Sequence, residues 1–179
     1  TSTDVSCFGS VDGDADVVFV CADPGCTQEW FNANTGATTG ETSTHLGPIG
    51  AGDYFVQVTN ASGCITIENV TIDTPSEIIP NEVITEIICA GNSDGSIVLT
   101  PTGGSGAGYL YDWNPVPSNG NGLNSATGIG IGLWSVTITD SDGCSQVSDF
   151  NILGTNSIDI VPVLTDVDCN GANNGIIST

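Results

Sequence analysis

Seven cysteines and a group of regularly spaced carboxylates are the side chains of this chain whose types and spacing could do chemistry. Residues 7–13 read Cys-Phe-Gly-Ser-Val-Asp-Gly, and related segments return at residues 89–95 and 169–175. The cysteines that open these segments are 82 and 80 residues apart. A fixed period with matching landmarks indicates tandem copies of one structural unit, so these cysteines are expected to hold structural positions.

A second landmark closes each copy. Residues 52–64 end in Asn-Ala-Ser-Gly-Cys, and residues 132–144 end in Asp-Ser-Asp-Gly-Cys. Each complete copy therefore has one cysteine near its start and one near its end. This arrangement predicts two disulfides inside the copies, Cys7–Cys64 and Cys89–Cys144.

The remaining cysteines are an extra pair and an odd one. Cys21 and Cys26 flank a Pro-Gly turn dipeptide, which predicts a local disulfide across a hairpin. Cys169 opens a third copy that stops at Thr179, so we expect its partner to lie further along a longer chain. A free reactive thiol is the alternative for Cys169. Such a cysteine framework is typical of oxidising, extracytoplasmic compartments.

Three carboxylates at alternate positions, Asp12, Asp14 and Asp16, form a candidate metal site, and the acidic residues near the unit boundaries are a separate candidate for calcium. The spacing of the three carboxylates resembles the beginning of an oxygen-ligand loop for calcium, although no glutamate follows at the place of the distal ligand. The alternative is a solvated acidic strand edge, since alternate residues of a strand share a face. Calcium is thus the only cofactor that the sequence suggests.

No catalytic constellation is expected. His45 is the only histidine, and the second copy has none at the corresponding place. A nucleophilic triad or a histidine metal site would need partners that the chain does not repeat. We interpret His45 as a loop or core histidine and predict that the protein is not an enzyme.

The charge excludes some partners. The chain has no Lys or Arg and 21 Asp and Glu, which gives a net charge of -21. Nucleic acids and anionic membranes are therefore not expected as partners, because binding phosphate requires basic side chains. No apolar run approaches the roughly 18 residues of a membrane span, so direct membrane insertion is not expected either.

The elements that position these residues are predicted to be short strands. Strand-like runs of β-branched and aromatic residues are punctuated by Gly- and Asn-rich turns, and no segment has a helical apolar period. The predicted strands cover residues 16–21, 54–59, 64–72, 96–100 and 134–139, with a possible bulge near Asn69. This pattern favours antiparallel β-sandwiches, immunoglobulin-like in the broad sense.

Four aromatic residues occupy matching places in the two copies: Trp30 with Trp113, and Tyr54 with Trp134. We predict that all four lie in the cores of the sandwiches. The alternative for the first pair is an exposed platform that stacks on sugar rings.

Clusters of Pro, Gly, Ser and Asn follow the last strand of each copy and set the predicted domain boundaries. The predicted domains are two repeats at residues 1–76 and 77–157, and the start of a third at residues 158–179. Because these linkers are short and adjoin apolar runs, we expect the units of about 80 residues to be arranged end to end as a semi-rigid rod.

The combined pattern resembles the SprB-type repeat of the large surface adhesins of gliding Bacteroidota. In the second copy this resemblance rests on Cys89, Gly91, Asp94, Gly95, Gly103, Gly104, Tyr109, Tyr111, Trp113, Val136, Thr137, Thr139, Asp140, Gly143 and Cys144. The first copy matches less fully, since Cys21 and Cys26 replace its glycine-rich hairpin. The resemblance implies a secreted, cell-surface adhesin shaft, exported by the type IX route and linked to surface attachment or gliding motility.

Two alternatives to the shaft stay open. One is a carbohydrate-binding accessory module of a larger secreted protein, and the other is a filament subunit completed by strand addition from a neighbour. The partners expected for a shaft are neighbouring repeats of the same chain and surface polysaccharide. Burial of Trp30 and Trp113 would favour the shaft, and their joint exposure on one face would favour sugar binding.

Overall fold

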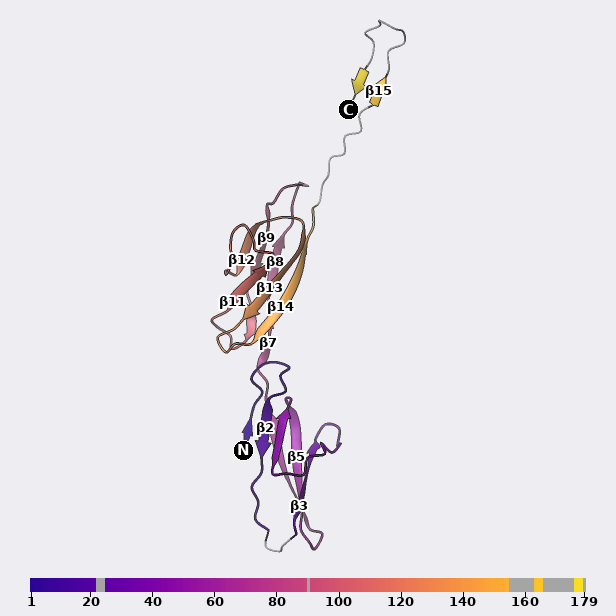
Figure 1. The fold of residues 1–179 in the computed structure, drawn as a ribbon, viewed down its shortest axis with the longest axis vertical. Helices are drawn as coiled ribbons and strands as arrows, with labels where there is room; N and C mark the ends of the chain where they lie inside the picture. The colour runs from indigo at the N-terminus through magenta and orange to yellow at the C-terminus, as the bar shows by residue number, and fades with distance from the viewer. Residues whose placement is uncertain (22–24, 90, 155–162, 166–175, 179) are drawn as a thin grey trace.

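A computed structural model describes the chain except residues 22–24, 90, 155–162, 166–175 and 179. The described residues are all β: they form strands and turns and contain no helix. Two β-sandwich units follow one another end to end along the long axis of the molecule (Figure 1). The predicted all-β, immunoglobulin-like fold class is therefore confirmed.

The first unit packs two three-stranded antiparallel sheets against each other. The strand orders are β1-β2-β4 in one sheet and β3-β5-β6 in the other. The bounds are β1 Ser2–Thr3, β2 Gly13–Asp16, β3 Thr27–Asn32, β4 His45–Ile49, β5 Gly52–Thr59 and β6 Ile65–Ile72.

The second unit repeats this arrangement with strand orders β8-β9-β12 and β11-β13-β14. The bounds are β8 Glu82–Thr85, β9 Gly95–Leu99, β11 Leu110–Asn114, β12 Ser125–Ile129, β13 Gly132–Thr139 and β14 Ser145–Ile152. It also has a third pairing, in which β7 Ser76–Ile79 runs antiparallel to β10 Thr102–Gly104. In the described part of the first unit, no strand pair corresponds to β7 and β10.

Further along the chain, β15 Val163–Thr165 pairs with β16 Ile176–Ser178. The predicted boundaries at residues 76/77 and 157/158 stay predictions. The second of them lies outside the described residues.

Alternation of side chains explains the long strands. In β13 the residues Trp134, Val136 and Ile138 are buried, and the residues between them are partly exposed. The pairing of β5 with β6 runs without a break through Phe55 and Asn69. The expectation of a bulge near Asn69 was therefore wrong.

The strand expected at residues 16–21 is displaced toward the N-terminus. It is β2, which ends at Asp16 and buries Gly13 and Ala15. A Cβ atom on Gly13 would lie 2.7 Å from Cγ2 of Ile72, so the two sheets approach too closely here for a larger side chain. Residues 17–20 form no strand: Val18 and Val20 are exposed, and Val17 packs partly buried against the first core.

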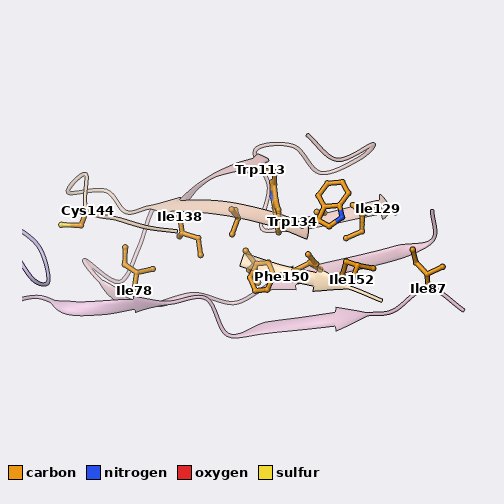
Figure 2. Close-up of a cluster of buried hydrophobic side chains, with 13 residues drawn as sticks. Ile78, Ile87, Trp113, Ile129, Trp134, Ile138, Cys144, Phe150 and Ile152 are labelled. Carbon is orange, nitrogen blue, oxygen red and sulfur yellow. The ribbon is translucent and has the colours of Figure 1, made fainter. Parts of the chain in front are cut away.

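Each unit has its own hydrophobic core. All four aromatic residues predicted to be core residues are buried, with Trp30 and Trp113 only 2% and 1% exposed. Figure 2 shows the second core, where Trp113 packs at a tilt on Phe150 with ring centroids 6.5 Å apart. The residues of this core are Ile78, Ile87, Ile97, Leu99, Trp113, Ala126, Ile129, Trp134, Val136, Ile138, Cys144, Phe150 and Ile152.

Candidate functional site: the junction between the units

A disulfide between Cys7 and Cys144 joins the two units. Its Cα atoms are 5.5 Å apart, and its cysteines are separated by 137 residues in sequence. Cys7 lies in the loop between β1 and β2, and Cys144 precedes β14 in the hairpin after β13. The bond therefore fixes a loop of the first unit to a hairpin of the second.

This bond corrects the predicted pairing. Cys7 is not bonded to Cys64, and Cys144 is not bonded to Cys89. Among the described residues, Cys64 and Cys89 are the cysteines outside disulfides, and both are exposed. The physical reason is that the opening and closing cysteines of one unit lie at opposite ends of it. The opening cysteine of the first unit instead meets the closing cysteine of the second unit at the junction.

The local structure of the opening loop holds Cys7 in place. Gly9 has a φ of 76°, and the Ser10 N–H donates to the Cys7 carbonyl at 3.0 Å, which closes a tight turn. The Asp12 carboxylate accepts a hydrogen bond from the Ser6 hydroxyl and another from the Ser6 N–H at 3.0 Å. These bonds lower the pKa of Asp12, the hydroxyl bond most, because they favour the ionised carboxylate.

The closing turn is built around Asp140, a buried carboxylate. One oxygen accepts the N–H groups of Cys144 and Asp142 at 2.9 and 3.0 Å, and the other accepts the Ser105 N–H at 2.9 Å. The Ser105 bond contributes most to lowering the pKa of Asp140, because donated N–H groups favour the anion. Asp140 thus connects the hairpin that carries Cys144 to the β10 turn.

Strand β7 completes the junction, since the chain passes through it from the first unit into the second (Figure 1). Its Ile78 is buried in the second core. On the facing strand β10, Gly103 has a φ of 91°, and a Cβ atom there would lie 1.8 Å from the Glu77 carbonyl oxygen. Only glycine therefore permits β7 to lie this close to β10.

The junction is closely packed. Residues of both units, including Phe8, Pro75 and Gln146, line a cavity of about 30 Å³ beside the disulfide. Cys144 is 7% exposed, and its Sγ lies 3.3 Å from the carbonyl oxygen of Ser6. This interface consequently leaves little room for the units to pivot about the disulfide.

The other predicted disulfide, Cys21–Cys26, is present in the structure, with Cα atoms 6.3 Å apart. Residues 22–24 between these cysteines and Cys169 of the third copy lie outside the described residues. The local bond lies within the first unit and takes no part in the junction.

The predicted trio of carboxylates is not gathered into one site. Asp14 and Asp16 lie together with His45, with one possible ligand atom of each within 4.8 Å of the others. Asp12 instead caps the opening loop. His45 begins strand β4 instead of lying in a loop or core, and its Nδ1 lies 3.0 Å from an oxygen of Asp16. Calcium binding stays a prediction, for which this structure offers two carboxylates and an imidazole.

Sequence comparison finds the SprB repeat family, whose model matches residues 81–118. The resemblance inferred above is thereby confirmed for this segment, which runs from the residue before β8 into the loop after β11. Residues 81–118 are thus similar to a SprB repeat. A comparison with curated proteins finds no match. In the described part of the chain, no helix has the length and apolar character needed to cross a membrane.

Solved structures of immunoglobulin-like proteins align with the chain at low similarity. Insect hemolin gives 12% identity and a TM-score of 0.35, covering 74% of this chain and 40% of hemolin. The mouse nectin-like molecule 4 ectodomain gives 9% identity and a TM-score of 0.37, covering 77% of this chain and 57% of that ectodomain. An intimin fragment gives 16% identity and a TM-score of 0.38, covering 85% of this chain and 61% of the fragment. That fragment was solved with the intimin-binding domain of its translocated receptor. The chain spans less than two thirds of each, and at these scores the likeness carries no functional argument.

Proposed function

We propose that this chain is a shaft segment of a secreted, repetitive cell-surface adhesin, in which β-sandwich units are joined end to end and fixed to their neighbours. The observation that carries this proposal is the Cys7–Cys144 disulfide, which crosses the junction between the two units. A disulfide inside each unit would stabilise that unit alone. A disulfide between units restricts their relative orientation, which is what a shaft requires.

The tryptophans support the shaft over a carbohydrate-binding module. Trp30 and Trp113 are both buried, so neither presents a ring face to a sugar. Their indole N–H groups donate to the carbonyl oxygens of Ser43 and Leu123 at 3.0 and 2.9 Å. Both side chains are thus fully used in the fold.

The remaining parts of the proposal follow from the adhesin repeat. We place the shaft on the outer cell surface, with neighbouring repeats as its partners, surface polysaccharide as a candidate target, and attachment or gliding as its use. A non-enzymatic role is included in the proposal. It is supported by the similarity of residues 81–118 to a SprB repeat.

Small-angle scattering of the oxidised chain tests the proposal. We expect the dimensions of an extended pair of units. The double variant Cys7→Ser/Cys144→Ser should broaden the distribution of interatomic distances, because the units can then pivot. The matched control, Cys21→Ser/Cys26→Ser, removes a local disulfide and should leave the scattering unchanged. A compact, folded-back pair of units in the oxidised protein would refute the shaft, and saturable binding of soluble glycans would favour the accessory module.

A further inference from the structure

Strand β2 carries two carboxylates on the outer face of its sheet. Its buried residues, Gly13 and Ala15, face the core. Asp14 and Asp16 alternate with them and therefore project from the outer face. Asp16 pairs in register with His45 on the neighbouring strand β4, which places the imidazole beside that carboxylate. The His45 Nδ1 atom lies 3.0 Å from a carboxylate oxygen of Asp16.

Possible metal ligands from two strands therefore gather at one place. One donor atom each from Asp14, Asp16 and His45 lies within 4.8 Å of the others. Among the residues that the structure describes, no other group of three or more histidine, cysteine or acidic side chains is placed to hold an ion. Gly47 on β4 leaves the space for Asp14, because a Cβ atom on this glycine would lie 2.8 Å from the Asp14 Cβ.

The kinds of donor atom decide which ion fits the group. Calcium takes oxygen ligands, roughly six to eight of them, and an imidazole nitrogen is not among them. Zinc accepts imidazole nitrogen and carboxylate oxygen together, at distances of about 2.0–2.2 Å. Two such ligands of a tetrahedral zinc ion lie about 3.3 Å apart. The 3.0 Å between His45 Nδ1 and the Asp16 oxygen is close to that separation.

The charge of the chain also favours a bound cation at this place. The chain has no Lys or Arg, so no such side chain can neutralise the two carboxylates of β2. His45 is the only side chain that can carry a positive charge, and it does so only when protonated. A zinc ion would take the place of that proton and bring two positive charges to two negative ones.

We propose that Asp14, Asp16 and His45 form a zinc site on the outer face of the first unit, with water as the fourth ligand. Three protein ligands and one position open to solvent are the arrangement of an accessible zinc site. The bound ion connects strand β2 to strand β4 at the place where their pairing ends.

The second unit lacks this group. Val98 and Ser125 face each other across β9 and β12, at the register position that Asp16 and His45 occupy in the first unit. Ser96 stands two residues before Val98, where the first unit has Asp14. These side chains offer no carboxylate and no imidazole, so we expect one such site in the two units.

A titration with zinc chloride tests the proposal on the oxidised chain. The free thiols are first blocked with iodoacetamide, because thiolates also bind zinc. His45 is the only histidine, so its imidazole C–H signals in the proton NMR spectrum report on this site alone. We expect these signals to shift and to saturate with zinc, and calcium to bind at least about tenfold more weakly. Signals that do not move with zinc, or that saturate with calcium at an equal or lower concentration, would overturn the proposal.

Substitutions test which side chains hold the ion. His45→Gln and Asp16→Asn alter half-exposed side chains, so the fold should be retained, and each should weaken zinc binding at least about tenfold in calorimetry. The matched control is Asp12→Asn, which removes an acid of the same run that lies outside the group and should change the affinity less than about twofold. Equal losses in Asp12→Asn and Asp16→Asn would show that general negative charge attracts the ion, and the proposal would fail. Neither readout depends on whether the chain is a shaft.

Discussion

At the scale of single residues, Cys64 and Cys144 occupy corresponding turns but differ in environment. Cys144 is buried and bonded to Cys7 at the junction, whereas Cys64 is an exposed thiol. Cys144→Ser removes the inter-unit disulfide, whose loop of 137 residues gives a chain-entropy stabilisation of at most about 5 kcal/mol. We expect a large loss of unfolding free energy, measured by guanidinium denaturation of the oxidised chain. Cys64→Ser is the matched control and should change the stability by less than about 0.5 kcal/mol. Equal stabilities of the two variants would contradict the structural role of the Cys7–Cys144 bond.

The Asp140 carboxyl group should make the stability of the second unit depend on pH. The pKa of its carboxyl is lowered in the folded state, so ionised Asp140 stabilises the fold above the ordinary carboxyl pKa of about 4. This stabilisation is lost as the pH falls through the lowered pKa. We therefore expect the melting temperature to fall in acid, and to fall less steeply in Asp140→Asn.

The first unit provides the precedent for that substitution, because Asn60 already holds the corresponding turn with its amide oxygen. Asp140→Asn should thus fold, although it loses the acceptor for the Ser105 N–H. Calorimetry across the acid range measures the slope. An unchanged slope in the variant would assign the acid sensitivity to other carboxylates.

At the scale of elements, the pairing of β7 with β10 depends on one glycine. Gly103→Ala would place a Cβ atom 1.8 Å from the Glu77 carbonyl oxygen, so β7 must move away. The matched control is Gly106→Ala, which has a similar positive φ but nothing within 4 Å of the added atom. The control should lose about 1–2 kcal/mol of unfolding free energy from backbone strain, and Gly103→Ala should lose clearly more. Similar losses in urea denaturation would show that β7 contributes little.

The sequence predicts those strands in which buried apolar residues alternate with exposed residues along the strand itself. Strands β5 and β13 alternate cleanly because one face of each covers a core, and the core tryptophans follow from their place on β3 and β11. Strand β2 is misplaced because its buried positions are Gly13 and Ala15, whose small side chains give a weaker signal than the β-branched residues that follow. Close contact between the sheets explains the glycine at position 13.

The pairing of cysteines cannot be deduced from spacing in a tandem array. Disulfides within each unit and disulfides to the next unit both require one opening and one closing cysteine per repeat. The spacing of the cysteines is therefore the same in both cases and cannot distinguish them. Only the orientation of the opening loop relative to the closing turn decides between them. The acidic trio is divided for a different reason, since Asp12 lies before β2 and accepts hydrogen bonds from Ser6, whereas Asp14 and Asp16 lie on the strand.

At the scale of the whole molecule, the two units should keep their separation as the ionic strength changes. The net charge of -21 produces repulsion that salt screens, but the disulfide and the packed junction fix the distance between the units. We expect the radius of gyration to change little between low and high salt. Marked compaction on adding salt would show that repulsion holds the units apart.

Calcium can be added and chelated in the same scattering experiment. We propose, on the sequence argument, that any calcium bound near Asp14 and Asp16 acts within the first unit. It should therefore raise the melting temperature without changing the overall dimensions. A change in dimensions on chelation would place the ion at a junction instead.

The Cys7–Cys144 bond also determines how the molecule responds to a mechanical load. When the ends of the chain are pulled apart, force enters at the N-terminus, reaches Cys7 and passes through the sulfur atoms directly to Cys144. The polypeptide between them lies outside the load path, so its strands are not drawn out. Reduction would return that length to the path, and 137 residues correspond to roughly 450 Å of extended chain. The disulfide thus shields the residues between Cys7 and Cys144 from the load, and its redox state determines whether this part of the chain can stretch.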